Sequence, residues 1–293
     1  MLSSLAGRRI ELWVEARGGV AAINPVMQAL IQNLEAAGAT VDVRVPEHEV
    51  VDPRYLLDTR PPDLVLLKTA TTLSLSLALA DETQGVKFLN GARDTLHTHD
   101  KAATMARLAA AGIAVPETFL FQPGANGKVL PSGAGGMWVA KPTRGVHGRG
   151  VAIYPKFPAT LDSVATLDDD GSYVVDDGTR LVQRMVGGAE EDVKVYVAGE
   201  RLFAGFKTFG SESYAANEID AVTLDAQTEE MIHAVGEALG LRLFGVDLRF
   251  EDGEPVVIDA NPFPGYRGFP EAAPALRAEI ERALGERALG AFR

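Results

Sequence analysis

The sequence contains no cysteine among its 293 residues. This absence excludes disulfide bonds, thiolate metal sites and a cysteine nucleophile. It also fits a reducing compartment. A hydrophobic core must therefore hold the chain together, and a chain of this length can bury one without covalent cross-links.

Long hydrophobic runs are missing as well. The longest, at about residues 73–80, is interrupted by Ser74 and Ser76 and is too short to span a bilayer. The N-terminus lacks the basic start and apolar stretch of a secretory signal peptide. We therefore expect a soluble cytoplasmic protein without a membrane partner.

Positive charge is scarce, since 28 Lys and Arg residues stand against 40 Asp and Glu, for a net charge of −12. An acidic chain repels phosphate backbones, which argues against a broad nucleic-acid surface. A small basic pocket for an anionic small molecule is still allowed. The sequence leaves open whether the chain forms a homodimer.

Strand and helix patterns alternate in the first part of the chain. Short apolar runs predict strands at 10–14, 41–45, 63–67 and 86–89, with helices at 24–37 and 73–80 between them. This order predicts a parallel sheet covered by helices. We place this N-terminal α/β domain at about 1–98 and expect two further units, at 99–182 and 183–293.

A predicted C-terminal hairpin, with strands at 244–250 and 255–259, carries the strongest functional signal. Antiparallel pairing can bring Asp247 beside Asp259, and alternation puts Asp259 and Asn261 on one face. Two carboxylates and an amide oxygen form a hard, all-oxygen cluster. Such a cluster suits Mg²⁺ that bridges ATP phosphates.

The alternative is an ordinary acidic turn, but residues 251–253 already supply the turn. Asp247 and Asp259 instead interrupt strands made of Leu, Phe, Val and Ile. Inward carboxylates are costly unless they are paired or bound to a metal. The pattern therefore favours a metal site.

A second signal is the glycine-rich turn between strands predicted at 137–141 and 151–154. Lys141 ends the first strand and can reach phosphates, and the glycines free the backbone to wrap an anion. The turn is not a Walker A motif, because no Gly-Lys-Ser/Thr opens a helix. The candidate anion-binding residues are Lys141, Gly145, Gly148, Gly150 and Arg149. The alternative for Arg149 is an ordinary solvated surface residue.

Two weaker signals follow along the chain. A strand at 181–183 runs into a glycine-rich segment. The two could form a hinge that lines an adenine slot, or the strand could be a plain core strand. The hinge residues would be Gln183, Arg184, Met185 and Val186. Lys194 shares a strand face with Asp192 and Tyr196. If that face points inward, Lys194 would bind the acceptor or a phosphate, and otherwise it is ordinary surface.

Taken in order, these signals resemble the ATP-grasp superfamily over about residues 90–268, and segments 90–101 and 112–118 look like the start of its RimK-type and glutathione-synthetase-like members. The resemblance implies two α+β lobes that grip ATP behind the small parallel α/β domain. It also implies site residues: Lys101 and Lys141 for ATP phosphates, 183–186 for adenine, Glu191 for ribose, and Asp247, Asp259 and Asn261 for Mg²⁺, with Mn²⁺ as the alternative metal. Family hinges usually carry Glu where this chain has Arg184.

Two branches of the superfamily compete. RimK-type members are carboxylate–amine ligases that work through an acylphosphate, but they usually have Glu at the position of Asp259 and Asp-Ile-Arg at 192–194. Segments 63–68, 194–199 and 258–266 look instead like inositol-trisphosphate 5/6-kinases. A polyphosphate substrate would need more basic residues than this chain offers. We favour the ligase, with the kinase and a non-catalytic ATP-binding module as alternatives.

The acceptor is expected to be a small molecule, such as an amino acid or a peptide, and its identity cannot be read from the sequence. In the ligase hypothesis, Arg149, Lys207 or Arg267 orients the acceptor carboxylate. In the kinase hypothesis, Lys68, Lys194 and Arg149 hold substrate phosphates. The catalytic candidates are therefore Arg149, Lys194, Lys207 and Arg267, and Lys68 is a further acceptor contact.

Overall fold

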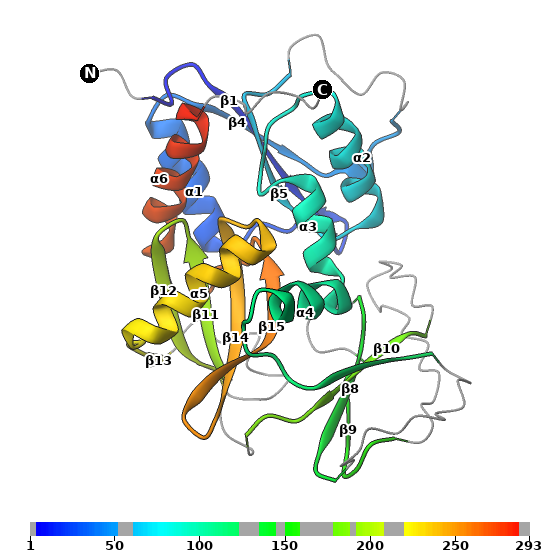
Figure 1. Ribbon diagram of the computed structural model, residues 1–293. Coiled ribbons are helices and arrows are strands. Elements are labelled where there is room, and N and C mark those ends of the chain that lie inside the picture. The colour runs from blue at the N-terminus through cyan, green and yellow to red at the C-terminus, as the bar shows by residue number, and fades with distance from the viewer. Residues whose placement is uncertain are drawn as a thin grey trace.

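The computed structural model describes residues 4–51, 61–122, 135–144, 150–158, 178–187, 192–207 and 220–286, and the side chain of Lys207 is not among the described parts. Three main sheets organise the chain: a parallel sheet of four strands and two antiparallel sheets of four and five strands. In Figure 1 the parallel sheet and its helices lie above the two antiparallel sheets. The fold thus consists of an N-terminal domain and two lobes.

The N-terminal sheet has the strand order β4-β1-β5-β6, and its strands are parallel as predicted. Its elements are β1 (Arg9–Val14), β4 (Thr40–Arg44), β5 (Leu64–Lys68), β6 (Phe88–Leu89), α1 (Pro25–Ala36) and α2 (Thr72–Thr83). Side chains of β1 alternate between two hydrophobic clusters, with Ile10 and Leu12 in one and Trp13 in the other. Both faces are therefore buried, which explains the unbroken apolar runs.

The last helix of the chain, α6 (Ala272–Gly285), completes this N-terminal domain. It packs beside α1 in Figure 1, and Leu276 and Ile280 share a hydrophobic cluster with Leu30 and Leu34 of α1. The two ends of the described chain are thus held in one core. The first domain depends on residues from the far end of the sequence.

The first antiparallel sheet, the N-lobe, has the strand order β7-β10-β8-β9. Its strands are β7 (Thr118–Phe121), β8 (Trp138–Pro142), β9 (Ala152–Tyr154) and β10 (Arg180–Arg184). Trp138, Phe157 and Phe119 pack edge to face or tilted on one side of the sheet. Because side chains alternate, Lys141 projects from the opposite side.

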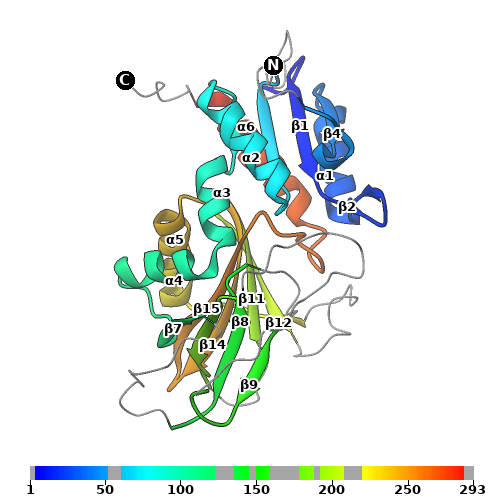
Figure 2. The same ribbon diagram turned by 90° about the vertical axis from the view of Figure 1, so that its right-hand side faces the viewer.

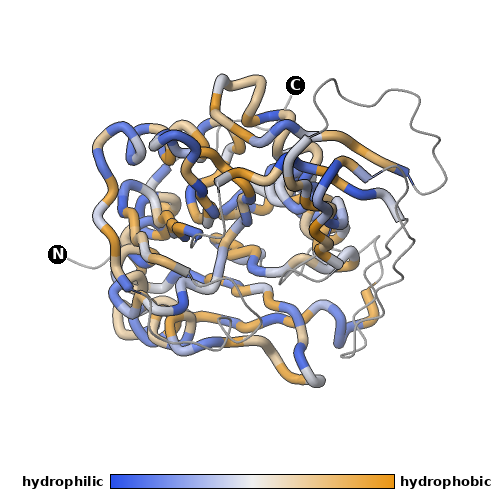
Figure 3. Tube along the Cα trace, turned by 90° about the horizontal axis from the view of Figure 1, so that it is seen from below, coloured by the Kyte–Doolittle hydropathy of each residue, from blue (hydrophilic) through white to orange (hydrophobic). Residues whose placement is uncertain are grey.

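The second antiparallel sheet, the C-lobe, has the order β13-β12-β11-β14-β15. Its elements are β11 (Asp192–Ala198), β12 (Arg201–Lys207), β13 (Asp220–Ala221), β14 (Leu243–Glu251), β15 (Glu254–Pro262) and α5 (Ala226–Leu239). Val195 and Val246 pack with Ile232 and Leu239 of α5. Figure 2 shows α5 against this sheet. Figure 3 shows hydrophobic and hydrophilic residues alternating along the elements, as expected for elements that bury one face.

The helices α3 (Ala92–His99) and α4 (Lys101–Ala110) connect the N-terminal domain to the lobes. Asp100 caps helix α4 by accepting from the amides of Ala102 and Ala103. Helix α3 and the two-residue strands β2 (Ala16–Arg17) and β3 (Val20–Ala21) were not predicted. In the part of the chain that is described, no helix has the length and apolar character needed to cross a membrane.

A buried acid in the N-terminal domain makes stability depend on pH. Asp81 of α2 is 5 % exposed, and burial raises its pKa to about 6 although Arg44 opposes the shift. The folded state keeps this proton up to about pH 6, whereas the unfolded chain loses it near the ordinary aspartate pKa of 3.8. Stability therefore falls as pH rises from about 4 to about 6, and the loss persists above pH 6.

We expect Asp81→Asn to remove this decline. Relative to the wild type, the variant should gain about 1–3 kcal/mol of unfolding free energy between about pH 4.5 and about pH 8. Urea unfolding at the two pH values measures the gain. Asp252→Asn, in an exposed turn, is the matched control. An equal wild-type-to-variant difference at both pH values would contradict the prediction.

Candidate active site

The β14–β15 hairpin brings together the carboxylates that the sequence singled out. Asp247 lies directly opposite Asp259 in the ladder, which confirms the predicted pairing. Asn261 lies two residues further along and its Nδ2 is 3.4 Å from Asp259 Oδ2. A register shift between Asp247 and Leu248 leaves Ile258 as an extra residue on β15. This bulge sets the two carboxylates face to face.

Lysines from three different elements surround these carboxylates. Lys101, at the start of α4, places Nζ 2.8 and 2.9 Å from the two oxygens of Asp259. Lys194 of β11 lies opposite Asp247, with its Nζ 2.6 Å from Oδ1. Lys141 of β8 donates to the carbonyl of Ile258, the bulged residue, at 2.9 Å. Lys194 therefore points inward, the orientation that the sequence left open.

The charges in this cluster are strongly coupled because it is largely shielded from water. Burial alone would raise the pKa of Asp259, but Lys101 and Lys141 lower it to about 2. Burial alone would lower the pKa of Lys194, but Asp247 raises it above its ordinary value. Burial lowers the pKa of Lys141 to about 8, against the pull of Asp259. The aspartate is thus ionised at neutral pH and the cations outnumber the carboxylates.

The donor set fits a divalent cation. Two aspartates and an asparagine offer oxygen ligands on one face, and both aspartates are now held by ammonium groups, which a metal ion can replace. The surplus of lysines fits a polyanion beside that metal, because an ammonium group is a point charge that binds phosphate. The arrangement can therefore hold a metal–phosphate ligand between the lobes.

The predicted hinge connects the two lobes through its backbone and side chains. Met185 N donates to Met137 O at 2.8 Å, and Gln183 Nε2 donates to Thr118 Oγ1 at 3.1 Å. Arg184 forms a two-bonded ion pair with Glu251 at 2.8 and 2.9 Å, so its guanidinium is directed to the β14–β15 turn. The segment thus contacts both lobes, and its role as a hinge that lines the adenine remains a prediction.

Several predicted residues cannot be compared with the structure. Gly145, Gly148, Arg149 and Glu191 lie outside the described residues, as does the side chain of Lys207. Gly150 is described, with a φ of 69° that favours glycine. The roles of the undescribed residues remain predictions from the sequence.

Two contacts were missed by the sequence analysis. His99 Nε2 lies 3.2 Å from Thr69 O, and burial lowers the pKa of His99 to about 4, so this imidazole is neutral at pH 7. Arg249 Nε lies 2.6 Å from Asp192 Oδ1, and its Nη1 donates to the hinge carbonyl of Val186 at 3.3 Å. The available signal for the Arg249–Asp192 contact was a polar residue that faces a charged residue on the neighbouring strand.

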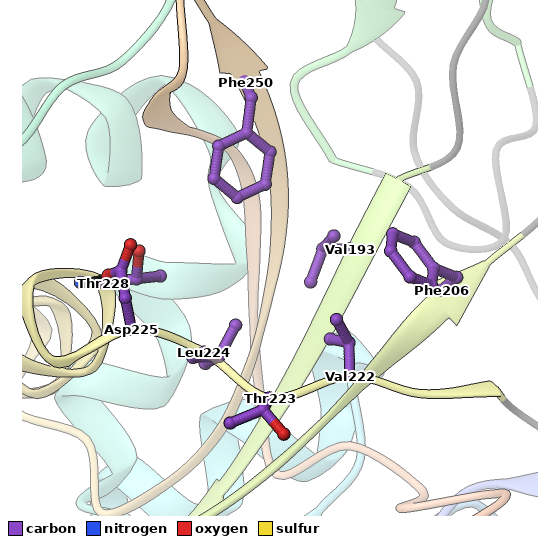
Figure 4. Close-up of a pocket in the computed structure, with 8 residues that line it drawn as sticks. All are labelled: Val193, Phe206, Val222, Thr223, Leu224, Asp225, Thr228 and Phe250. Carbon is purple, nitrogen blue, oxygen red and sulfur yellow. Dashed lines mark hydrogen bonds between the residues drawn. The ribbon is translucent and has the colours of Figure 1, made fainter.

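An apolar groove of about 570 Å³ lies on the other face of the C-lobe sheet. Figure 4 shows Val193 and Phe206 at this groove, with Val222 and Leu224 from the segment before α5. Val193 belongs to the cluster that packs on α5, whereas its neighbour Lys194 faces the carboxylates. The groove is therefore separate from the candidate site.

A family model described as an ATP-grasp domain matches residues 98–265. That match spans more than half of the chain, and the chain belongs to the ATP-grasp family. The matched range includes Lys101, Lys141, Lys194 and the β14–β15 hairpin.

Curated relatives carry the name probable alpha-L-glutamate ligase. The protein of Legionella pneumophila (strain Paris) is 25 % identical over 199 residues, covering 65 % of this chain and 64 % of the relative. The protein of Xylella fastidiosa (strain M12) is 29 % identical over 195 residues, covering 64 % and 63 %. The similarity thus spans less than two thirds of these relatives' length.

Solved structures share the fold over nearly the whole chain. The RimK domain ATP-grasp protein of Sphaerobacter thermophilus is 19 % identical, covers 94 % of this chain and 99 % of its own, and has a TM-score of 0.66. The D-alanine–D-alanine ligase of Bacillus anthracis complexed with ATP is 17 % identical, with coverage of 95 % and 97 % and a TM-score of 0.65. The ATP-grasp ligase PsnB, complexed with a minimal precursor, Mg and ADP, is 18 % identical, with coverage of 97 % and 99 % and a TM-score of 0.61. At these identities the likeness shows the fold.

Proposed function

We propose that this protein is an ATP- and Mg²⁺-dependent carboxylate–amine ligase that releases ADP and acts on a small molecule or peptide. The observation that carries the proposal is the pairing of Asp247 with Asp259 across the β14–β15 hairpin, ringed by Lys101, Lys141 and Lys194. The names of the curated relatives and of the structural neighbours support a ligase.

One set of residues would hold the metal ion, and another set would bind the ATP phosphates. Asp247, Asp259 and Asn261 would hold Mg²⁺ (Mn²⁺ is the alternative), which neutralises charge on the phosphoryl group being transferred. Lys101 and Lys141 would bind ATP phosphates from the N-lobe side. The hinge at 183–186 would line the adenine, with Glu191 at the ribose and the loop carrying Gly145, Gly148, Arg149 and Gly150 over the phosphates.

The reaction proceeds in two displacements. An oxygen of the acceptor carboxylate attacks the γ-phosphorus of ATP, the bond from that phosphorus to the β–γ bridging oxygen breaks, and ADP leaves. The amine nitrogen then attacks the carbonyl carbon of the acylphosphate, phosphate leaves with the C–O bond pair, and the amine proton passes to solvent. Lys194 would stabilise the phosphoryl oxygens, and Arg149, Lys207 and Arg267 would orient the acceptor. Catalysis rests on positioning and charge stabilisation.

Trapping the acylphosphate tests the ligase. We expect incubation with ATP, Mg²⁺, pooled amino acids and hydroxylamine to yield a hydroxamate together with ADP. Asp259→Asn should abolish both, and Asp252→Asn should abolish neither. ADP release with inositol phosphates and no hydroxamate would favour a kinase instead. A chain that binds ATP without forming ADP under any condition would be a non-catalytic module.

A further inference from the structure

The turn that joins helices α3 and α4 contacts the N-terminal domain and both lobes. His99 Nε2 lies 3.2 Å from the carbonyl oxygen of Thr69, in the N-terminal domain. The backbone amide of Lys101 donates at 2.9 Å to the carbonyl of Thr143, which follows β8 of the N-lobe. The ammonium group of Lys101 reaches the C-lobe, where it lies 2.8 and 2.9 Å from the oxygens of Asp259. The position of this turn therefore sets where Lys101 lies relative to Asp259.

Asp100 is the single residue between His99 and Lys101, and it makes the turn tight. Its backbone is extended, with φ −93° and ψ 105°, so that α3 ends before it and α4 begins directly after it. Its carboxylate accepts from the amides of Ala102 and Ala103 at 3.0 and 3.1 Å. Because the start of α4 is capped in this way, a displacement of His99 is passed on to Lys101.

The carbonyl that His99 contacts belongs to a firmly held segment of the N-terminal domain. Thr69 is 6 % exposed and follows Lys68, the last residue of β5. Its hydroxyl oxygen accepts from the amide of Thr71 at 3.3 Å. Thr71 caps α2 and its hydroxyl donates to the carboxylate of Glu47. The carbonyl of Thr69 is therefore a fixed point to which the imidazole can be anchored.

The direction of this hydrogen bond follows from the chemistry of the two groups. A carbonyl oxygen can only accept, so the Nε2 of His99 carries the hydrogen. Burial lowers the pKa of His99 to about 4, with Lys101 and Arg144 adding to the shift, so the ring is neutral at pH 7. A neutral ring adds no further charge beside the lysines. His99 can thus influence the site through geometry and not through charge.

We propose that His99 is a positioning residue for Lys101: its hydrogen bond to the Thr69 carbonyl fixes the α3–α4 turn on the N-terminal domain, and the turn holds the ammonium group of Lys101 at the ATP phosphates. The proposal rests on the proposed function for the role of Lys101. It makes ATP binding between the lobes depend on a contact in the N-terminal domain. His99 itself need not touch the nucleotide.

Two substitutions separate this hydrogen bond from the rest of the side chain. His99→Leu cannot donate, whereas His99→Gln keeps an N–H donor in its amide. Calorimetric titration of the full-length chain with Mg²⁺ and the non-hydrolysable analogue β,γ-imido-ATP measures the effect. His99→Leu should bind the analogue about three- to tenfold more weakly, the size of one lost hydrogen bond. His99→Gln should bind it as the wild type does. His97→Leu, the same change at an exposed histidine of α3, should leave binding unchanged.

A double-variant cycle shows whether His99 acts through Lys101. Lys101→Met removes the phosphate contact itself and should weaken binding about tenfold or more, as for a lost hydrogen bond to a charged group. If His99 only positions Lys101, adding His99→Leu to Lys101→Met should weaken binding no further. If the role of His99 were merely structural, the two changes would act independently and their losses would multiply.

Each outcome of these titrations supports or overturns the assignment. Weaker binding by His99→Leu, recovery in His99→Gln and no further loss in the double variant support it. Unchanged binding by His99→Leu, an equal loss in His99→Gln or multiplied losses overturn it. Thermal unfolding checks that each variant is folded. If His99→Leu does not fold, His99→Asn replaces it, because its shorter amide does not reach the Thr69 carbonyl.

Failure of this proposal is distinguishable from failure of the proposed function. A supporting cycle in a chain that traps no hydroxamate would keep the positioning role and reject the ligase. A trapped hydroxamate together with multiplied losses would keep the ligase and reject the positioning role. A wild-type chain that does not bind the analogue would overturn both.

Discussion

Replacing Asp259 with asparagine is expected to lower turnover by roughly 1,000-fold while the protein stays folded. The carboxylate is ionised at neutral pH and faces Asp247 across the hairpin. An amide keeps the shape and one oxygen but loses the charge that a divalent cation needs. Removing several kcal/mol of charge stabilisation from the transferred phosphoryl group corresponds to a loss of turnover of roughly 1,000-fold.

Asp252→Asn is the control for this result. It makes the same chemical change in the same hairpin, at an exposed turn residue with a φ of 54° that asparagine adopts readily. Steady-state ADP release should be unchanged in the control, and thermal unfolding should stay cooperative in both variants. A fully active Asp259→Asn protein would remove the metal site from the proposal.

Lys194→Met is expected to damage both stability and activity. Lys194 and Asp247 are 14 % and 16 % exposed, so the substitution leaves an aspartate without its counter-ion in a largely buried place. Removing one partner of a buried ion pair costs about 3–5 kcal/mol of unfolding free energy. Because this pair is partly exposed, we expect a loss of about 3 kcal/mol. Turnover should fall together with stability, because the substitution removes the cation that lies opposite Asp247, one of the proposed metal ligands.

A double variant separates these two effects. Lys194→Met combined with Asp247→Asn removes both charges, so unfolding free energy should recover toward the wild type while activity stays lost. Chemical denaturation of the four proteins in the cycle measures the coupling. Lys156→Met is the exposed control. Additive losses of stability would show that the two side chains do not interact, contrary to their 2.6 Å approach.

The ion pairs also explain why a site for a polyanion can exist in an acidic protein. Each aspartate is matched by a lysine from a different element, so the two carboxylates contribute little uncompensated negative charge. Lys141 adds a further cation through its contact with the carbonyl of Ile258. The net charge of the chain therefore says little about the local potential, which depends on these few buried groups.

Elements with a strong hydrophobic pattern were predicted from the sequence. β1, β5 and α1 lie within a few residues of their predicted bounds, because each buries a face against the core. Helix α3 was missed because its buried positions are mostly small or polar, with Thr95 and Thr98 facing inward. Strands of two residues, such as β2 and β3, are too short for any period to emerge.

The sequence by itself determined which residue types carry the chemistry, namely carboxylates that interrupt apolar strands and a lysine at a strand end. It could not decide their register. Counting outward from the β14–β15 turn pairs Asp247 with Ile258, and only the bulge at Ile258 brings Asp259 opposite instead.

Tertiary structure also decided which lysines meet these carboxylates. One of these contacts joins residues that are 158 positions apart in the sequence, Lys101 and Asp259. Local propensity acts over a few residues, whereas the packing of the domains sets these distances.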